Sequence, residues 1–285
     1  MAKTAAIDAS GITFSGLAAG DGQPALLLHG FPDTPFSLSS QVDHLGGRGF
    51  RAFAPALRGY PPTGGDGPFG IDRLASDALE LLEQMGANPD SPGVLIGHDW
   101  GGIIACAAAA TRPEIMSHVV IMSVPHPMVM GARFLSGDFD QLKRSWYMFF
   151  FQMPGLAESV VSADNFAFLE RLMLDWSPNL IQNEGRAEIE RRKLVLSAPG
   201  ALSSALGYYR AMFGESQVAV GPVRVQALVI FGAEDGCIAP TICDGMEALF
   251  PAGYSFEVIE GAGHFVPSES PDAVNSLISG FLANQ

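Results

Sequence analysis

Between residues 94 and 110 the sequence passes from a short apolar run through a glycine-flanked polar centre into a helix-like stretch. Val94–Ile96 has the character of a buried strand, Ile103–Ala110 that of a helix, and the segment between them contains Gly-His-Asp-Trp-Gly-Gly. The small residues around Asp99 permit a strained turn from strand to helix. Such a turn would lift the Asp99 side chain to the carboxyl edge of a parallel sheet, beside a helix N-terminus that favours negative charge. The alternative role for Asp99 is that of an ordinary N-cap residue.

Short apolar runs alternate with helical patterns along most of the chain, which indicates an α/β fold with a mostly parallel central sheet flanked by helices. Between residues 71 and 85 apolar residues recur at helical spacing, and Gly86 follows as a stop signal. A second helical pattern follows Pro271. The predicted strands are Ala25–Leu28, Arg51–Ala54, Val94–Ile96, Val119–Ser123, Leu228–Phe231 and Ser255–Ile259.

The strand pattern stops between residues 126 and 217, where Met, Phe, Trp, Tyr and Leu become frequent. Residues 144–158 and 165–176 are predicted to be helices with more apolar surface than one sheet face requires. We therefore predict a core domain formed by residues 1–125 and 218–285, with residues 126–217 as a helical cap over the sheet. Pockets commonly form at such a boundary. The alternative is a helical insertion that takes no part in catalysis.

The composition restricts the partners and cofactors of the chain. A formal net charge of -14 argues against binding to nucleic acid and to anionic membrane surfaces, because no basic stretch is present to neutralise phosphates. Neither a membrane-spanning run nor a signal-peptide pattern is found in the sequence. Cys106, Cys237 and Cys243 show no metal-ligand spacing and are interpreted as free thiols of a cytoplasmic protein. We expect neither a metal ion nor an organic cofactor.

Two more polar residues follow predicted strands. Asp235 lies just past one strand in the segment FGAEDGC, and His264 lies just past the next strand in the segment GAGHF. Together with Asp99 they give the order nucleophile, acid and histidine, each at the carboxyl end of a strand. This order at three strand ends favours a catalytic triad over three unrelated polar residues. Glu234 is a weaker candidate for the acid because it precedes the turn.

The segment His29-Gly30-Phe31-Pro32 follows the first predicted strand, at a place where a backbone N–H can stabilise an oxyanion. We assign the N–H donors of the oxyanion hole to Phe31 and Trp100. Residues near these donors, together with one residue of the cap, are predicted to line the substrate pocket: His29, Pro32, His98 and Met148.

On these motifs the chain resembles the α/β-hydrolase superfamily, and its epoxide hydrolase branch most closely. The resemblance extends over nearly the whole chain and also includes Arg58-Gly59-Tyr60 and two segments of the cap. It implies that the Phe31–Pro32 peptide bond is cis. Two departures concern loop detail and substrate range: Ala56 replaces an Asp that is frequent in the family, and Gly236-Cys237 after the acid is not the usual sequence.

The two cap segments provide tyrosines. The segment WYMFFFQMPGLAE resembles the first tyrosine segment of the family and places Tyr147 at the catalytic position. The segment GYYR resembles the second and places Tyr209 there, with Tyr208 as the alternative. Without the resemblance, each of these tyrosines would be read as a packing residue of an aromatic helix.

A carboxylate nucleophile restricts the reaction. Attack on an acyl carbon would give a mixed anhydride, whereas attack on a saturated carbon with a leaving group gives an enzyme ester. His264, oriented by Asp235, would then deprotonate a water molecule that attacks the Asp99 ester. The predicted substrates are therefore an alkyl electrophile and water.

Epoxides and alkyl halides both fit this scheme. An opening epoxide produces an alkoxide, which a pair of tyrosine hydroxyls can protonate, whereas a departing halide needs N–H donors. Haloalkane dehalogenases usually have Asn where Phe31 stands, and fluoroacetate dehalogenases usually have Arg where Trp100 stands. We therefore predict an epoxide hydrolase acting on small apolar epoxides, with a haloalkane or haloacid dehalogenase as the alternative. A non-catalytic receptor and an esterase are two further hypotheses, and neither requires this set of residues.

Overall fold

The computed structural model describes residues 1–214 and 220–283. Within these residues an eight-stranded sheet has the order β1-β2-β4-β3-β5-β6-β7-β8. Strand β2 is antiparallel to both of its neighbours, and the other neighbouring strands are parallel, which confirms the predicted fold class. The strands are β1 (Lys3–Ala9), β2 (Ile12–Ala19), β3 (Gln23–Leu28), β4 (Phe50–Pro55), β5 (Gly93–His98), β6 (Met116–Met122), β7 (Gln226–Gly232) and β8 (Tyr254–Ile259).

The predicted strands are all present, as β3 to β8, whereas β1 and β2 were not predicted. These two strands form a hairpin at the edge of the sheet, with Ala9 opposite Ile12. The turn residues Ser10 and Gly11 both have positive φ values, of 54° and 76°. Small and polar residues dominate both strands and many are exposed, so the sequence contains no apolar run that would have indicated them.

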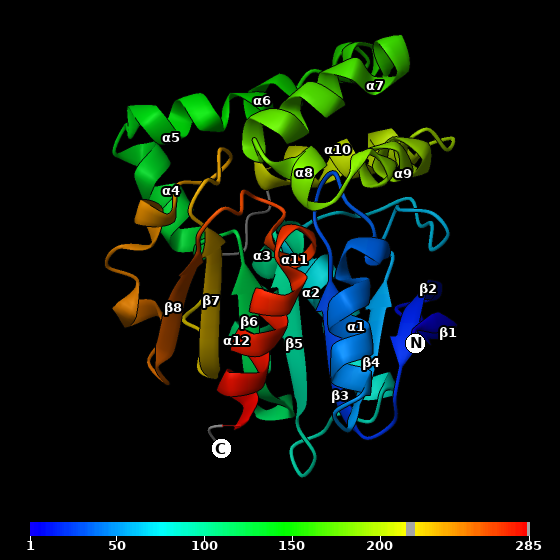
Figure 1. Ribbon diagram of the computed structural model, residues 1–285, viewed down its shortest axis with the longest axis vertical. Helices are drawn as coiled ribbons and strands as arrows, with labels where there is room; N and C mark the ends of the chain where they lie inside the picture. The colour runs from blue at the N-terminus through cyan, green and yellow to red at the C-terminus, as the bar shows by residue number, and fades with distance from the viewer. Residues whose placement is uncertain (215–219, 284–285) are drawn as a thin grey trace.

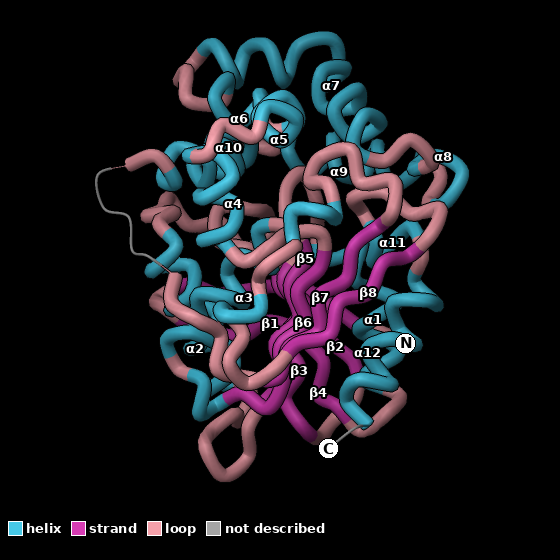
Figure 2. Tube along the Cα trace, turned by 90° about the vertical axis from the view of Figure 1, so that its left-hand side faces the viewer, coloured by secondary structure: helices cyan, strands magenta, loops and turns pink. Residues whose placement is uncertain are grey.

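Helices cover both faces of the sheet, as Figure 2 shows. Helices α1 and α12 pack together on one face, and α2 and α3 pack together on the other. Strand β3 is buried on both sides, so successive residues such as Leu27 and Leu28 belong to different apolar clusters. The helices that accompany the sheet are α1 (Ser39–Gly46), α2 (Ile71–Gln84), α3 (Trp100–Thr111), α11 (Val266–Glu269) and α12 (Pro271–Ala283). Short 3₁₀ helices are η1 (Pro35–Leu38), η2 (Pro113–Ile115), η3 (Pro240–Cys243) and η4 (Glu247–Leu249).

A second group of helices follows β6 and lies above the carboxyl ends of the strands, at the top of Figure 1. This is the region predicted as the cap, and its predicted end, between residues 217 and 218, lies outside the described residues. The division into two domains stays a prediction. The helices are α4 (Pro127–Leu135), α5 (Phe139–Arg144), α6 (Trp146–Phe150), α7 (Leu156–Trp176), α8 (Leu180–Asn183), α9 (Arg186–Leu196) and α10 (Ala201–Met212).

The prediction of one helix over residues 144–158 was wrong. Helix α6 ends at Phe150, and α7 begins only at Leu156. Pro154 and Gly155 lie between them, and Gly155 has a φ of 79°, which a helix cannot contain. Helix α7 is interrupted at residues 163–166, where Asp164, Asn165 and Phe166 have positive φ values, so the helix predicted over residues 165–176 forms only after Phe166. In the described part of the chain, no helix is both long enough and apolar enough to cross a membrane.

A buried ion cluster joins α9 to the loops of the sheet. The Arg192 guanidinium is 1% exposed and lies 3.0 Å from Asp33 Oδ1 and 2.9 Å from Glu184 Oε2. It also lies over the Phe265 ring, next to His264 in the chain. Despite the opposing effect of burial, Arg192 lowers the pKa of the Asp33 carboxyl far below its usual range. The cluster thus fixes the position of α9 against the loops that contain Phe31 and His264.

Replacing Arg192 by Met is expected to lower the free energy of unfolding by about 3–5 kcal/mol, because Asp33 and Glu184 would remain buried without their cation. The matched control is Arg191→Met, since Arg191 is the adjacent residue but pairs with Glu188 at the surface. This control is expected to lose less than about 1 kcal/mol. Urea denaturation of both variants measures the difference. Equal losses would show that the buried cluster does not stabilise the fold in this way.

Candidate active site

Asp99 occupies the turn between β5 and α3 with a φ of 50° and a ψ of -118°. The turn is possible because its flanking residues are glycines: a Cβ on Gly97 would lie 2.1 Å from the Gly101 carbonyl oxygen, and one on Gly101 would lie 2.1 Å from that of Leu28. Although Asp99 stands at the N-cap position of α3, its side chain makes no capping hydrogen bond. The role of an ordinary N-cap residue therefore does not explain why an aspartate stands at this position.

The three predicted triad residues meet at the carboxyl ends of their strands. His264 Nδ1 lies 2.9 Å from Asp235 Oδ2, and His264 Nε2 lies 3.6 Å from Asp99 Oδ2. The other Asp235 oxygen accepts the backbone N–H groups of Cys237 and Ile238, each at 2.8 Å. The carboxylate that orients the imidazole is thus itself held in place. Glu234 is exposed and accepts a hydrogen bond from Asn179 instead.

The two carboxylates determine the charge of His264. Burial lowers the pKa of this imidazole, but Asp235 and Asp99 outweigh that effect and raise the pKa to about 10. With Asp99 ionised, His264 therefore holds a proton at neutral pH. Any change that removes the charge of Asp99 would lower the pKa of His264 and favour the neutral imidazole.

The raised pKa predicts how the contribution of His264 to stability depends on pH. This contribution is complete below the ordinary histidine pKa of 6.5 and is lost as the pH rises through the folded-state pKa of about 10. The difference in free energy of unfolding between the wild type and His264→Gln, measured by urea denaturation, should therefore shrink from pH 6.5 to pH 10. A difference that grew over this range would contradict the ion pairs described above.

The loop after β3 holds one oxygen of the Asp99 carboxylate. The Phe31 N–H donates to Asp99 Oδ1 at 2.7 Å, as expected of an oxyanion-hole donor. A Cβ on Gly30 would lie 2.3 Å from the same oxygen, so this close approach requires glycine. The Phe31–Pro32 peptide bond is cis, as the resemblance implied. Trp100, the other predicted donor, directly follows Asp99 as the first residue of α3.

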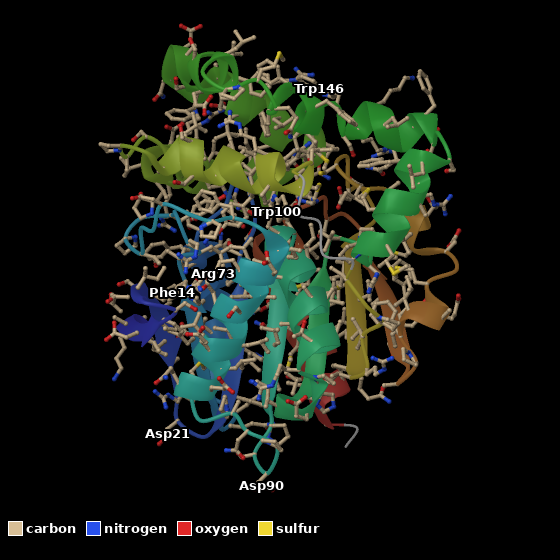
Figure 3. All side chains as sticks on the ribbon, turned by 180° about the vertical axis from the view of Figure 1, so that it is seen from behind. Phe14, Asp21, Arg73, Asp90, Trp100 and Trp146 are labelled. Atoms are coloured by element: carbon tan, nitrogen blue, oxygen red, sulfur yellow. The ribbon has the colours of Figure 1, made fainter. Side chains whose placement is uncertain are left out.

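Met148 and Asp99 line a cavity of about 470 Å³ between the sheet and the helices above it. Figure 3 shows Trp100, which also lines the cavity, at this junction. Three predicted pocket residues, His29, Pro32 and His98, are buried but are not among the described residues that line the cavity.

His29 and His98 have structural partners instead. His29 Nδ1 donates to the Gly30 carbonyl oxygen at 2.9 Å, and its Nε2 accepts the Leu57 N–H at 3.1 Å. His98 Nε2 donates to the His264 carbonyl oxygen at 2.8 Å, and its Nδ1 lies 3.6 Å from Asp33 Oδ2. The prediction that His29 and His98 line the pocket was therefore wrong. Both histidines instead hold the loops of the site through these buried contacts.

Both predicted tyrosines line the cavity together with Asp99, and their ring centroids are 5.7 Å apart. Burial raises the pKa of Tyr147 and of Tyr209 well above 10, and the Asp99 charge adds to this effect, so both remain proton donors. The Tyr147 hydroxyl lies 3.4 Å from Cys237 Sγ. The Tyr209 hydroxyl makes no hydrogen bond of regular geometry within the described residues, whereas Tyr208 donates to the Arg58 carbonyl oxygen at 2.7 Å. Tyr209, not Tyr208, therefore has a hydroxyl available to a ligand.

A clamp that the sequence did not indicate joins the two tyrosine segments. Arg210, next to Tyr209, donates to Glu158 through both terminal nitrogens, at 2.7 and 3.0 Å, and to the Phe151 carbonyl oxygen at 3.0 Å. Gln152 donates to the Tyr209 carbonyl oxygen at 3.0 Å. The hydrogen bonds from Arg210 lower the pKa of Glu158 to about 2. A glutamate three residues after Gly155 was recognisable as a capping signal, but its partner 52 residues away was not.

Asp235, Cys237 and His264 place potential metal ligands within 4.8 Å of one another in the described part of the chain. The Asp235 oxygens, however, already accept two backbone N–H groups and His264 Nδ1. Burial also raises the pKa of the Cys237 thiol well above its usual value, which disfavours the thiolate that binds metals. These contacts fit a histidine–carboxylate pair better than a metal site. All three cysteines of the chain are buried free thiols.

Comparison with known proteins adds independent findings. The model of a family described as "Alpha/beta hydrolase family" matches residues 25–277. "Epoxide hydrolase 3" of Xenopus tropicalis is 32% identical, covering 96% of this chain and 75% of that protein. "AB hydrolase superfamily protein YfhM" of Bacillus subtilis is 34% identical, covering 98% of this chain and 97% of that protein. The crystal structure of an epoxide hydrolase from Bacillus megaterium in complex with an inhibitor superimposes with a TM-score of 0.86 at 26% identity, covering 98% of this chain and 100% of that chain.

Proposed function

Because this chain belongs to the α/β-hydrolase family, and its matched relatives include proteins named epoxide hydrolases, we propose that it is an epoxide hydrolase with Asp99 as its nucleophile. One observation carries the proposal: a carboxylate facing a histidine–aspartate pair shares an apolar cavity with two protonated tyrosines. In this proposal α4 to α10 form the cap that supplies the tyrosines. The same residues explain both half-reactions.

In the first half-reaction, Asp99 Oδ2 attacks an epoxide carbon and the carbon–oxygen bond of the ring breaks. Asp99 Oδ1 is held by the Phe31 N–H, which leaves Oδ2 as the attacking atom. The ring oxygen takes a proton from the hydroxyl of Tyr147 or Tyr209, and a hydroxyalkyl ester of Asp99 results. The buried hydroxyls are suited to this role because an alkoxide is more basic than a tyrosinate.

In the second half-reaction, the ester no longer has the negative charge that helped to keep His264 protonated. The pKa of His264 therefore falls, its proton passes to the tyrosinate left by the first half-reaction, and its Nε2 is then free to accept a proton from the attacking water. The water oxygen adds to the ester carbonyl carbon, and the oxyanion forms on Oδ1, next to the Phe31 N–H and the first turn of α3. Collapse of this intermediate breaks the bond between the carbonyl carbon and Oδ2. The leaving alkoxide takes the proton of the hydroxyl that came from water, which gives the diol and restores the Asp99 carboxylate.

The dehalogenase alternative uses the same triad but needs different groups for the leaving halide. Phe31 provides no side-chain N–H, and Tyr147 and Tyr209 offer the O–H donors that an alkoxide requires. We therefore rank epoxides first. The test is a panel of epoxides and haloalkanes, scored for diol formation and for halide release with the wild-type protein. Halide release without diol formation would reverse the ranking.

Replacing Tyr209 by Phe is expected to slow ester formation by about 10²-fold or more, because a general acid contributes about that much to proton transfer. The matched variant is Tyr208→Phe, which removes the hydrogen bond to the Arg58 carbonyl oxygen and should chiefly lower stability, by about 1–3 kcal/mol. Single-turnover kinetics and thermal unfolding separate the two effects. If Tyr208→Phe were the slower enzyme, the two assignments would have to be exchanged.

A further inference from the structure

The described lining of the cavity provides no positive charge to a bound molecule. Its described lining contains no Lys, Arg or His, and its only ionisable groups are Asp99 and three tyrosines. Helix α4 forms much of one wall, with Met128, Gly131 and Leu135 at helical spacing. The described lining is therefore apolar except for the groups that would take part in the chemistry.

The exposure of the lining residues distinguishes a closed end from a rim. Asp99 is 5% exposed, and Tyr147 and Tyr209 are 3% and 2% exposed. Leu135, in contrast, is 92% exposed and Met128 is 49% exposed. The rim of the cavity thus includes the end of α4 at Leu135, and a substituent that extends from Asp99 along this apolar wall approaches it.

The cations nearest in sequence to this wall are already engaged elsewhere. Arg133 lies 3.8 Å from a carboxylate oxygen of Asp138, and the Lys143 ammonium lies 4.7 Å from the centre of the Phe139 ring. Arg144 donates to the Asp235 carbonyl oxygen at 2.8 Å. None of the three lines the cavity. A carboxylate on the substrate would thus lose its hydration without gaining a partner, in a cavity that already contains the charge of Asp99.

We propose that the cavity selects uncharged epoxides and discriminates against those whose substituent carries a carboxylate, with α4 as the wall that determines this selectivity. The inference rests on the proposed function, because it concerns the substrate of the same site. The net charge of -14 acts in the same direction, since it repels anions during the encounter.

Three para-substituted epoxides test this selectivity: styrene oxide, 4-carboxystyrene oxide and the methyl ester of the latter. The rigid ring holds the para substituent at a fixed distance from the epoxide, on the side of the ring away from Asp99. We expect kcat/KM for the methyl ester to exceed that for the acid by roughly tenfold or more, which corresponds to about 1.4 kcal/mol. Equal values for the acid and the ester would overturn the proposal.

A cation introduced at the rim provides the second part of the test. Leu135→Lys should raise the ratio of kcat/KM for the acid to kcat/KM for the methyl ester several-fold. The matched control is Leu194→Lys, because Leu194 is 72% exposed on α9 and does not line the cavity. An equal gain in both variants would assign the effect to net charge and overturn the role of α4.

Styrene oxide separates failure of this inference from failure of the proposed function. Turnover of styrene oxide together with equal turnover of acid and ester contradicts only the selectivity. If none of the three epoxides is hydrolysed by the folded wild-type protein, the proposed function fails and the selectivity fails with it.

Discussion

Replacing Asp99 by Ala is expected to lower the rate of diol formation by roughly 10⁴-fold or more, because Asp99 is the only carboxylate in the described lining of the cavity. Asp99 lies in the cavity next to both tyrosines, and its Oδ2 faces His264. The loss should therefore appear in kcat with every epoxide that the wild type hydrolyses. Initial rates with a styrene-oxide-type substrate measure it.

The control experiment for Asp99→Ala checks that the variant is still folded. Removing the carboxylate leaves the Phe31 N–H without its acceptor, so a modest loss of stability is expected as well. Circular dichroism and thermal unfolding must show that the variant is folded at the assay temperature. A folded variant with undiminished activity would contradict the assignment of Asp99 as nucleophile.

Replacing His264 by Gln is expected to leave ester formation possible and to stop ester hydrolysis. The first half-reaction depends on Asp99 and the tyrosines, whereas the second requires a base within reach of the ester. The variant should therefore release little diol and accumulate a covalent adduct. Mass spectrometry should find one added substrate mass on the peptide that contains Asp99.

His118→Gln is the matched control for this experiment, because His118 is a buried histidine of β6 whose ring packs against Phe281, away from the cavity lining. It should hydrolyse epoxides without accumulating an adduct. An inactive, folded His264→Gln protein without any adduct would argue against the two-step scheme. An adduct on a residue other than Asp99 would contradict the choice of nucleophile.

Local patterns were sufficient to predict where Asp99, Asp235 and His264 lie in the fold. Asp99, Asp235 and His264 each follow a strand that reads as an apolar run, and parallel strands bring their carboxyl ends to the same edge of the sheet. The glycines around Asp99 are equally local, because the turn itself requires them. The sequence therefore contains the site's framework in segments of five or six residues.

The ion pairs that the sequence did not predict join segments that are far apart in the chain. Arg192 reads as one basic residue among several on α9, and only the folded chain places it between Asp33 and Glu184. The pairing of Arg210 with Glu158 is hidden for the same reason. Such partners are far apart in the sequence, and no periodicity indicates them.

For two histidines next to the loops of the site, the sequence predicted a place in the pocket that the structure does not give them. His29 and His98 lie within the motifs of the site and were therefore placed in the pocket. Their rings instead satisfy buried backbone groups, namely the Leu57 N–H and the His264 carbonyl oxygen. Sequence proximity to a site thus did not distinguish a residue that contacts the substrate from one that supports the loop behind it.

The most direct test of the covalent mechanism is a single turnover in water labelled with ¹⁸O, with the enzyme in excess over the epoxide. The proposed cleavage transfers Oδ2 of Asp99 to the diol and replaces it with an oxygen from water. The covalent mechanism therefore predicts an unlabelled diol and one ¹⁸O atom in the peptide that contains Asp99. A labelled diol together with an unlabelled Asp99 would show that water attacks the epoxide directly, and would contradict the covalent mechanism.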